Sequence, residues 1–139
     1  MSSPQEQTVR NQRHAPLIGI TIRDYQEADE LNWVRCRVLA FLDSSYRDDV
    51  QPYREVYENP AVQIVAIDQQ TQQLVGFLDA EFEQRPGAVC SFDGPLGAVI
   101  WHLGVLPEFR DRGIADAMWN CVKNRLADQG IQRVQVWTQ

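Results

Sequence analysis

The sequence predicts an α/β fold with a mixed central sheet flanked by helices, in the chain order β-α-α-β-β-β-α-β. Two stretches support this prediction. Residues 62–83 contain two apolar runs with a polar turn between them, which is typical of a β-hairpin. Residues 99–129 read as an apolar strand, a short turn and an amphipathic helix. A length of 139 residues is enough for one domain with a real core.

The first half of the chain predicts one strand and two helices before the hairpin. Residues 19–23 alternate and are rich in β-branched side chains, which favours a strand. A helix with Asp29 in its first turn should follow. Its apolar residues recur at helical spacing: Leu31, Val34, Val38, Phe41 and Leu42. Residues 44–59 are polar and aromatic, and Pro52 is expected to open a short second helix there.

The second half predicts a loop, two more strands and a helix between them. After the hairpin, residues 84–97 form the loop, and residues 99–105 the central strand. The last strand is expected at residues 131–138. The helix should begin near residue 114 and end before Gly130, which would serve as the C′ glycine. One apolar stripe supports it: Ile114, Ala117, Met118, Cys121, Val122 and Leu126.

Composition excludes several classes of function. The net charge of −6 argues against nucleic acid as a partner and permits a cationic amine substrate. No apolar stretch approaches the roughly 20 residues of a membrane span, so no membrane partner is expected. Residues 1–15 are polar and read as a disordered tail rather than a signal peptide. Residues 16–139 should form the domain.

The cysteines and histidines point to a cytoplasmic protein without a metal. Cys36, Cys90 and Cys121 are an odd number and form no C-x-x-C pair, which favours reduced thiols. His14 and His102 are too few for a histidine-based metal site, and their spacing to the cysteines gives no zinc pattern. We therefore expect no metal.

The turn between the central strand and its helix predicts an anion site. The first helical turn leaves several backbone N–H groups free at the positive end of the helix, where a phosphate can bind. Gly113 has no Cβ, so an anion can approach the backbone closely. Ala115 keeps the next turn small, and two arginines add positive charge. The stretch reads Arg110, Asp111, Arg112, Gly113, Ile114 and Ala115.

This stretch resembles a known signature. Val105-Leu106-Pro107, then Arg110-x-x-Gly113-x-Ala115, then Ala117-Met118 are similar to the pyrophosphate-binding signature of the GNAT superfamily of N-acetyltransferases. The resemblance implies a GNAT-like sheet over residues 20–138 and acetyl-CoA as cosubstrate. It also implies that the region around Tyr46, Tyr53 and Tyr57 borders the acceptor site; the alternative is that these tyrosines only pack their helix onto the sheet.

The resemblance assigns a position to each part of the cofactor. The pantetheine arm should run along the central strand at Leu103, Gly104 and Val105, with backbone groups bonding it as an added strand would. Gly104 is compatible with the bulge that splays this strand in family members. The pyrophosphate should rest on the amides of residues 110–115. The Leu103 N–H is then the natural donor to the thioester oxygen.

The general base is less clear. Many family members carry a Glu at the position that Val99 occupies here, and valine cannot take a proton. His102 is one candidate, although a lone histidine on a strand is often a packed residue. Glu81 is the other, because Asp79, Glu81 and Glu83 share one strand face and could raise one another's pKa. The alternative for these carboxylates is a solvated face.

Two functions remain open. The first is an acyl-CoA-dependent N-acyltransferase that acetylates a primary amine of a small molecule or peptide by direct attack in a ternary complex. The second is a CoA-binding module with a degenerate site. A P-loop nucleotide binder is set aside, because the Lys-Ser/Thr pair is missing.

Family members usually continue past the fifth strand with a helix and two strands, which often supply a tyrosine as general acid. Here the sequence ends at Gln139. Either the sequence is cut short, or a partner chain completes the sheet, or the protein binds the cofactor and catalyses little. A last strand ending near Thr138 would leave an edge that needs cover, and a homodimer is one way to provide it.

Overall fold

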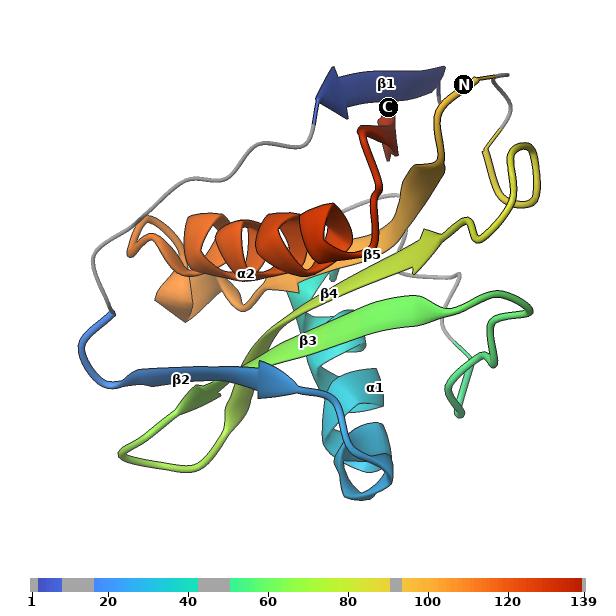
Figure 1. Ribbon diagram of the computed structural model, residues 1–139. Coiled ribbons are helices and arrows are strands. Elements are labelled where there is room, and N and C mark those ends of the chain that lie inside the picture. Colours follow the sequence, from blue (N-terminus) through green and yellow to red (C-terminus); the bar gives the residue numbers. More distant parts are fainter. Residues whose placement is uncertain (1–2, 9–16, 43–50, 91–93, 139) are drawn as a thin grey trace.

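A computed structural model describes residues 3–8, 17–42, 51–90 and 94–138. It contains a six-stranded sheet in the order β1-β6-β5-β4-β3-β2 (Figure 1). Neighbouring strands are antiparallel except β5 and β6, which are parallel. The strands are β1 Ser3–Thr8, β2 Ile20–Asp24, β3 Ala61–Asp68, β4 Leu74–Phe82, β5 Gly97–Val105 and β6 Arg133–Thr138. The α/β fold class and the five strands expected from the sequence are confirmed.

The two α-helices, α1 Glu30–Ala40 and α2 Ile114–Asp128, cover opposite faces of the sheet (Figure 1). Successive residues of β4 show this. The Phe77 ring lies 5.0 Å from the Trp33 ring of α1. A Cβ on Gly76 would lie 3.1 Å from the Met118 side chain of α2. Short 3-10 turns, η1 Glu27–Asp29 and η2 Pro107–Phe109, precede the two helices. Among the described residues, no helix has the length and apolar character to cross a bilayer.

The sequence prediction for α2 is confirmed, but the predicted face of α1 is right only in part: Val34 and Phe41 pack against the core, and the ends of the stripe do not. Leu31 is 81% exposed, whereas Trp33 is 3% exposed. The buried residues are Trp33, Cys36, Arg37 and Ala40. Apolar side chains lie all around this helix, so the pattern defines its buried face poorly. The bulky Trp33, packed on Phe77, decides it instead.

The expected second helix is also wrong where it can be checked. Residues 51–60, including Pro52, form no helix. The rest of the expected helix, with Tyr46, lies outside the described residues. Side chains of β4 bind this segment: Asp79 contacts Arg54 and Tyr57, and Glu81 accepts the Asn59 N–H at 3.0 Å. These bonds replace the hydrogen bonds that a helix would make within itself.

The disordered tail expected for residues 1–15 is corrected over residues 3–8, which form β1. This strand pairs antiparallel with β6, from Ser3 opposite Thr138 to Thr8 opposite Arg133. Pairing at a sheet edge uses backbone groups, so a polar sequence can supply it without an apolar pattern. The β6 edge that was expected to need cover is therefore paired within the chain. A homodimer stays a prediction.

The carboxylates of β4, and that of Glu83 directly after it, are buried, so the solvated-face alternative is wrong. Asp79, Glu81 and Glu83 are 0%, 8% and 1% exposed. Glu83 accepts three backbone N–H groups, from Val89 at 3.0 Å, Cys90 at 3.1 Å and Gly97 at 2.8 Å. Burial raises the pKa of Glu83, but these N–H groups lower it by more, so it lies below its usual value.

Replacing Glu83 with Gln should destabilise the fold by about 1–3 kcal/mol at neutral pH, because buried N–H groups lose a charged acceptor. Since the pKa of Glu83 is lower in the folded state, its contribution is present above the unfolded pKa of about 4.3 and is lost as pH falls through the folded value. Urea unfolding should show the two chains converging as the pH falls towards 3. The exposed Glu58→Gln is the control, expected within about 0.5 kcal/mol of wild type. Equal losses in both variants would contradict the assignment.

Candidate functional site

The central strand β5 has a free edge. It pairs with β6 only over residues 97–100, and the two strands no longer pair beyond that point. The Leu106 N–H donates to the Val75 carbonyl of β4 at 2.8 Å. Because bonding alternates along an antiparallel pair, Leu103 and Val105 lie at the non-bonded positions and their N–H and C=O groups point away from β4. These groups are therefore directed at the free edge.

A bulge at Trp101 sets which side chains share a face. His102 lies opposite Asp79 and Ile100 opposite Ala80, so Trp101 is the extra residue on β5. The indole N–H of Trp101 donates to Glu81 at 3.0 Å, so Trp101 lies on the face of the buried carboxylates. His102 lies opposite Asp79 and is on that face too, because the bulge lets two successive residues share one face.

Gly104 has a packing role, and the bulge lies elsewhere than expected. The sequence associated the bulge with Gly104, but the structure has it at Trp101. A Cβ on Gly104 would lie 2.6 Å from Phe77 and 3.0 Å from Phe41, too close for any side chain. The glycine therefore allows two aromatic rings to pack against β5.

The turn before α2 forms a cleft of about 450 Å³ with the free edge of β5. Gly113 has a φ of 81°, the left-handed region that favours glycine, and Asp111 has a φ of 61°. The first helical bond runs from the Ala117 N–H to the Gly113 carbonyl, so the preceding N–H groups of α2 lack such a partner within the helix. The cleft lining brings together nearly all the predicted cofactor residues: Leu103, Gly104, Val105, Arg110, Asp111, Gly113, Ile114 and Ala115.

The contacts of the two arginines of the turn, Arg110 and Arg112, differ from those expected. Arg110 was expected to face an anion, but its guanidinium donates to the carbonyls of Val105 at 3.2 Å and Ala40 at 2.7 Å. It therefore joins the end of β5 to the end of α1. Arg112 does not line the cleft and lies 4.8 Å over the Phe109 ring.

His102 lines a neighbouring hollow. This second hollow of about 250 Å³ is lined by His102 and Trp101, and it shares Phe41 and Leu103 with the first. The two hollows are therefore adjacent along β5, one at the start of α2 and the other at the imidazole.

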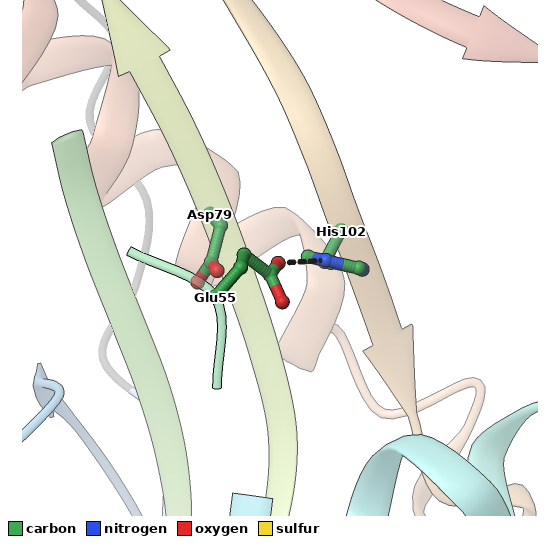
Figure 2. A group of neighbouring side chains, drawn as sticks. All are labelled: Glu55, Asp79 and His102. Carbon is green, nitrogen blue, oxygen red and sulfur yellow. Dashed lines mark hydrogen bonds and ion pairs between the residues drawn. The ribbon is translucent and has the colours of Figure 1, made fainter. Parts of the chain in front are cut away.

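Figure 2 shows the side chains that meet His102. The Glu55 carboxylate contacts His102 Nε2 and lies between His102 of β5 and Asp79 of β4. The hydrogen bond from His102 lowers the pKa of Glu55 to about 2, so Glu55 is ionised at neutral pH. Sequence reasoning missed Glu55, because it lies in an irregular segment that no periodic pattern connects to β5.

The cluster already contains its own positive charge. Ligand atoms of Glu55, Asp79 and His102 lie within 4.8 Å of one another. However, Arg54 Nη2 lies 2.7 Å from Asp79 Oδ2, and both side chains are buried. This guanidinium balances the Asp79 carboxylate without a metal ion.

Glu81, the other candidate base, has its oxygens bonded. Trp101 donates to Oε1 at 3.0 Å, and Asn59 donates to Oε2 from its backbone at 3.0 Å and its side chain at 3.2 Å. Val99 lies opposite Glu81 across the ladder. The Glu81 carboxylate therefore lies beside Val99, but its oxygens are bonded to Asn59 and to Trp101 of the bulge.

The comparisons identify the class of protein. A family model described as the acetyltransferase (GNAT) family matches residues 25–139. The chain therefore belongs to the GNAT family, as the resemblance predicted, and members of this family use acetyl-CoA.

Solved structures share the fold. A transcriptional regulator from Bacillus halodurans is 22% identical with a TM-score of 0.63, covering 86% of this chain and 82% of that one. An acetyltransferase from Vibrio fischeri is 22% identical with a TM-score of 0.61, covering 84% and 93%. AAC(6')-Iy, in complex with the bisubstrate analogue CoA-S-monomethyl-acetylneamine, is 17% identical with a TM-score of 0.61, covering 86% and 80%. At these identities the likeness concerns the fold alone.

Arg110→Ala should lower the free energy of unfolding by about 1–2 kcal/mol, because two backbone carbonyls lose their donor. Arg112→Ala is the matched control and should change it by about 0.5 kcal/mol or less. Urea unfolding of the three proteins measures both effects. A larger loss for Arg112→Ala would overturn the linking role of Arg110.

Proposed function

We propose that the chain is an N-acetyltransferase that moves the acetyl group of acetyl-CoA to a primary amine of a small molecule or a protein. The observation that supports it is the pair of adjacent hollows along the free edge of β5, one lined by Gly113 and the other by His102. One end suits a phosphate, and the other carries a group that can accept a proton.

The cofactor would follow these two hollows. The Leu103 carbonyl and the Val105 N–H would bond the pantetheine arm in place of the missing strand. The pyrophosphate would meet the N–H groups at the start of α2, where Gly113 and Ala115 leave room for it. The thioester would then lie beside the bulge, within reach of the imidazole.

The proposed reaction is a direct attack with both substrates bound. His102 takes one proton from the bound ammonium group, and the free amine nitrogen then forms a bond to the thioester carbon. The C–S bond breaks, and the leaving thiolate takes the second proton from that nitrogen, which gives the amide and CoA. The Leu103 N–H, which points to the free edge, is the candidate donor to the carbonyl oxygen.

We assign the base to His102 rather than Glu81. His102 lines the second hollow, and Glu55 is its one polar partner among the described residues, so one ring nitrogen stays available to the amine. The ionised Glu55 stabilises the imidazolium that forms. Glu81, in contrast, is 8% exposed and bonded to Trp101 and Asn59.

A larger hollow is the proposed entry for the acceptor. It has a volume of about 780 Å³ and is lined by Glu55 together with Glu27 and Glu30. Glu55 therefore lines this hollow and also contacts His102. Three carboxylates favour the approach of a protonated amine, in keeping with the net charge of −6.

Calorimetric titration with acetyl-CoA, followed by assay of free thiol with a panel of amines, tests the proposal. Binding with amine-dependent thiol release is the expected result. Binding without release for any amine would favour the alternative, a CoA-binding module. Absence of binding would contradict both.

Gly113→Ala should weaken acetyl-CoA binding at least about tenfold, or 1.4 kcal/mol. Its Cβ would disturb the left-handed turn from which the N–H groups point. Gly130→Ala is the matched control, because Gly130 follows the same helix with a φ of 77° against 81°. Both variants should lose about 1–2 kcal/mol of stability from the positive φ. Equal losses of affinity, measured by calorimetry, would contradict the phosphate-site assignment.

His102→Gln should lower turnover by about a hundredfold or more, because the amine loses its general base. The dissociation constant for acetyl-CoA should not change, since the cofactor contacts come from backbone groups. His14→Gln is the control and should leave turnover unchanged. Steady-state kinetics together with calorimetry separate the two effects, and a parallel loss of affinity would indicate a structural role for His102.

A further inference from the structure

Glu55 is placed by its neighbours in sequence rather than by secondary structure. It lies in the irregular segment 51–60, and its side chain is 43% exposed. A side chain of this kind normally samples several rotamers. Yet residues immediately around it reach the same atom of the sheet. Arg54 Nη2 and Tyr57 Oη each lie 2.7 Å from Asp79 Oδ2.

The Tyr57 hydroxyl also reaches the candidate catalytic pair. Its oxygen lies 3.0 Å from Glu55 Oε1, the same oxygen that contacts His102 Nε2. Burial raises the pKa of Tyr57, and the neighbouring Asp79 raises it further, so the hydroxyl keeps its proton at neutral pH. A phenol has one O–H, so its proton is shared between Asp79 Oδ2 at 2.7 Å and Glu55 Oε1 at 3.0 Å.

The residues that bind the Tyr57 hydroxyl and its acceptor are buried. Asp79 is fully buried on β4, and burial raises its pKa. Arg54 is 8% exposed, and its guanidinium lies 3.7 Å over the Trp33 ring and 4.8 Å over the Tyr25 ring. The Trp33 ring in turn meets the His102 ring edge-on at 5.2 Å. The His102 ring and the Arg54 guanidinium, which binds Asp79 next to Tyr57, thus pack on the same Trp33 ring.

We propose that Tyr57 is a positioning residue that holds Glu55 against His102, and that the buried Arg54–Asp79 pair holds Tyr57. The catalytic meaning of this contact rests on the proposed function, in which His102 takes the proton of the amine. Arg54 Nη1 lies 3.7 Å from the same Glu55 oxygen, so this guanidinium attracts the carboxylate as well. Without the hydroxyl, the carboxylate keeps this charge contact but loses a hydrogen bond that orients it towards the imidazole. Tyr57 itself touches neither the amine nor the thioester in this arrangement.

The His102 ring offers a readout that does not need a substrate. In a chain carrying His14→Ala, His102 is the one histidine left, and proton NMR follows its titration. The charged groups around it are Glu55, Asp79 of β4, Arg54 beside both carboxylates, and Arg37 of α1, which lines the same hollow. Glu55→Gln should move the midpoint of this titration to lower pH, because the imidazolium loses an adjacent negative charge.

Tyr57→Phe is the test variant. It should move the midpoint in the same direction as Glu55→Gln, and it should add nothing when combined with it, since both act through one contact. Tyr53→Phe is the matched control, because Tyr53 lies in the same segment and is 58% exposed. An unchanged midpoint in Tyr57→Phe, or a shift to higher pH, would overturn the proposal.

Kinetics distinguish this proposal from the proposed function. With an amine that the wild type acetylates, Tyr57→Phe should lower kcat about tenfold and leave the KM for acetyl-CoA unchanged. An unshifted midpoint in an active enzyme overturns the positioning role alone. A shifted midpoint in a chain that acetylates no amine supports the contact and rejects the transferase. Urea unfolding of Tyr57→Phe beside Tyr53→Phe confirms that both chains are folded.

Discussion

The buried carboxylates of β4 are the constraint on which the site depends. A carboxylate removed from water needs hydrogen bonds or an opposite charge, and each of the three obtains them from a different segment. Asp79 binds Arg54 and Tyr57, and Glu81 binds Asn59 and the bulge at Trp101. Glu83, directly after β4, binds the first residue of β5. One row of side chains thus fixes the irregular segments around the cleft, so the need to satisfy buried charge also defines the site.

The register of β5 converts this constraint into a binding surface. One extra residue, Trp101, turns His102 to the face of the carboxylates, while β6 stops pairing with β5 after residue 100. Leu103 and Val105 are left with backbone groups that no strand uses. The position of His102 and the open edge therefore arise where the pairing of β5 changes.

The sequence was sufficient for the features that depend on local pattern. The strands follow from the alternation of apolar and polar residues, and α2 follows from the apolar stripe that includes Met118. The turn before α2 follows from Gly113. The sequence was insufficient where tertiary contacts override a weak pattern. The face of α1 was decided by Trp33, which packs on Phe77. Glu55 contacts His102 from a segment in which Tyr57 binds Asp79, and no spacing in the sequence reveals these contacts. Polar Ser3–Thr8 forms a strand because an edge offers backbone partners.

The pairing of β1 with β6 has a consequence for how the cleft is made. β6 is bound to β5 over four residue pairs and to β1 over six, so the first described strand does much to hold the wall that diverges from β5 (Figure 1). These two strands come from opposite ends of the described chain, and their contact has a very large sequence separation. Such contacts form late and slowly. During synthesis, the edge of β5 therefore stays without its diverging neighbour until β6 has emerged.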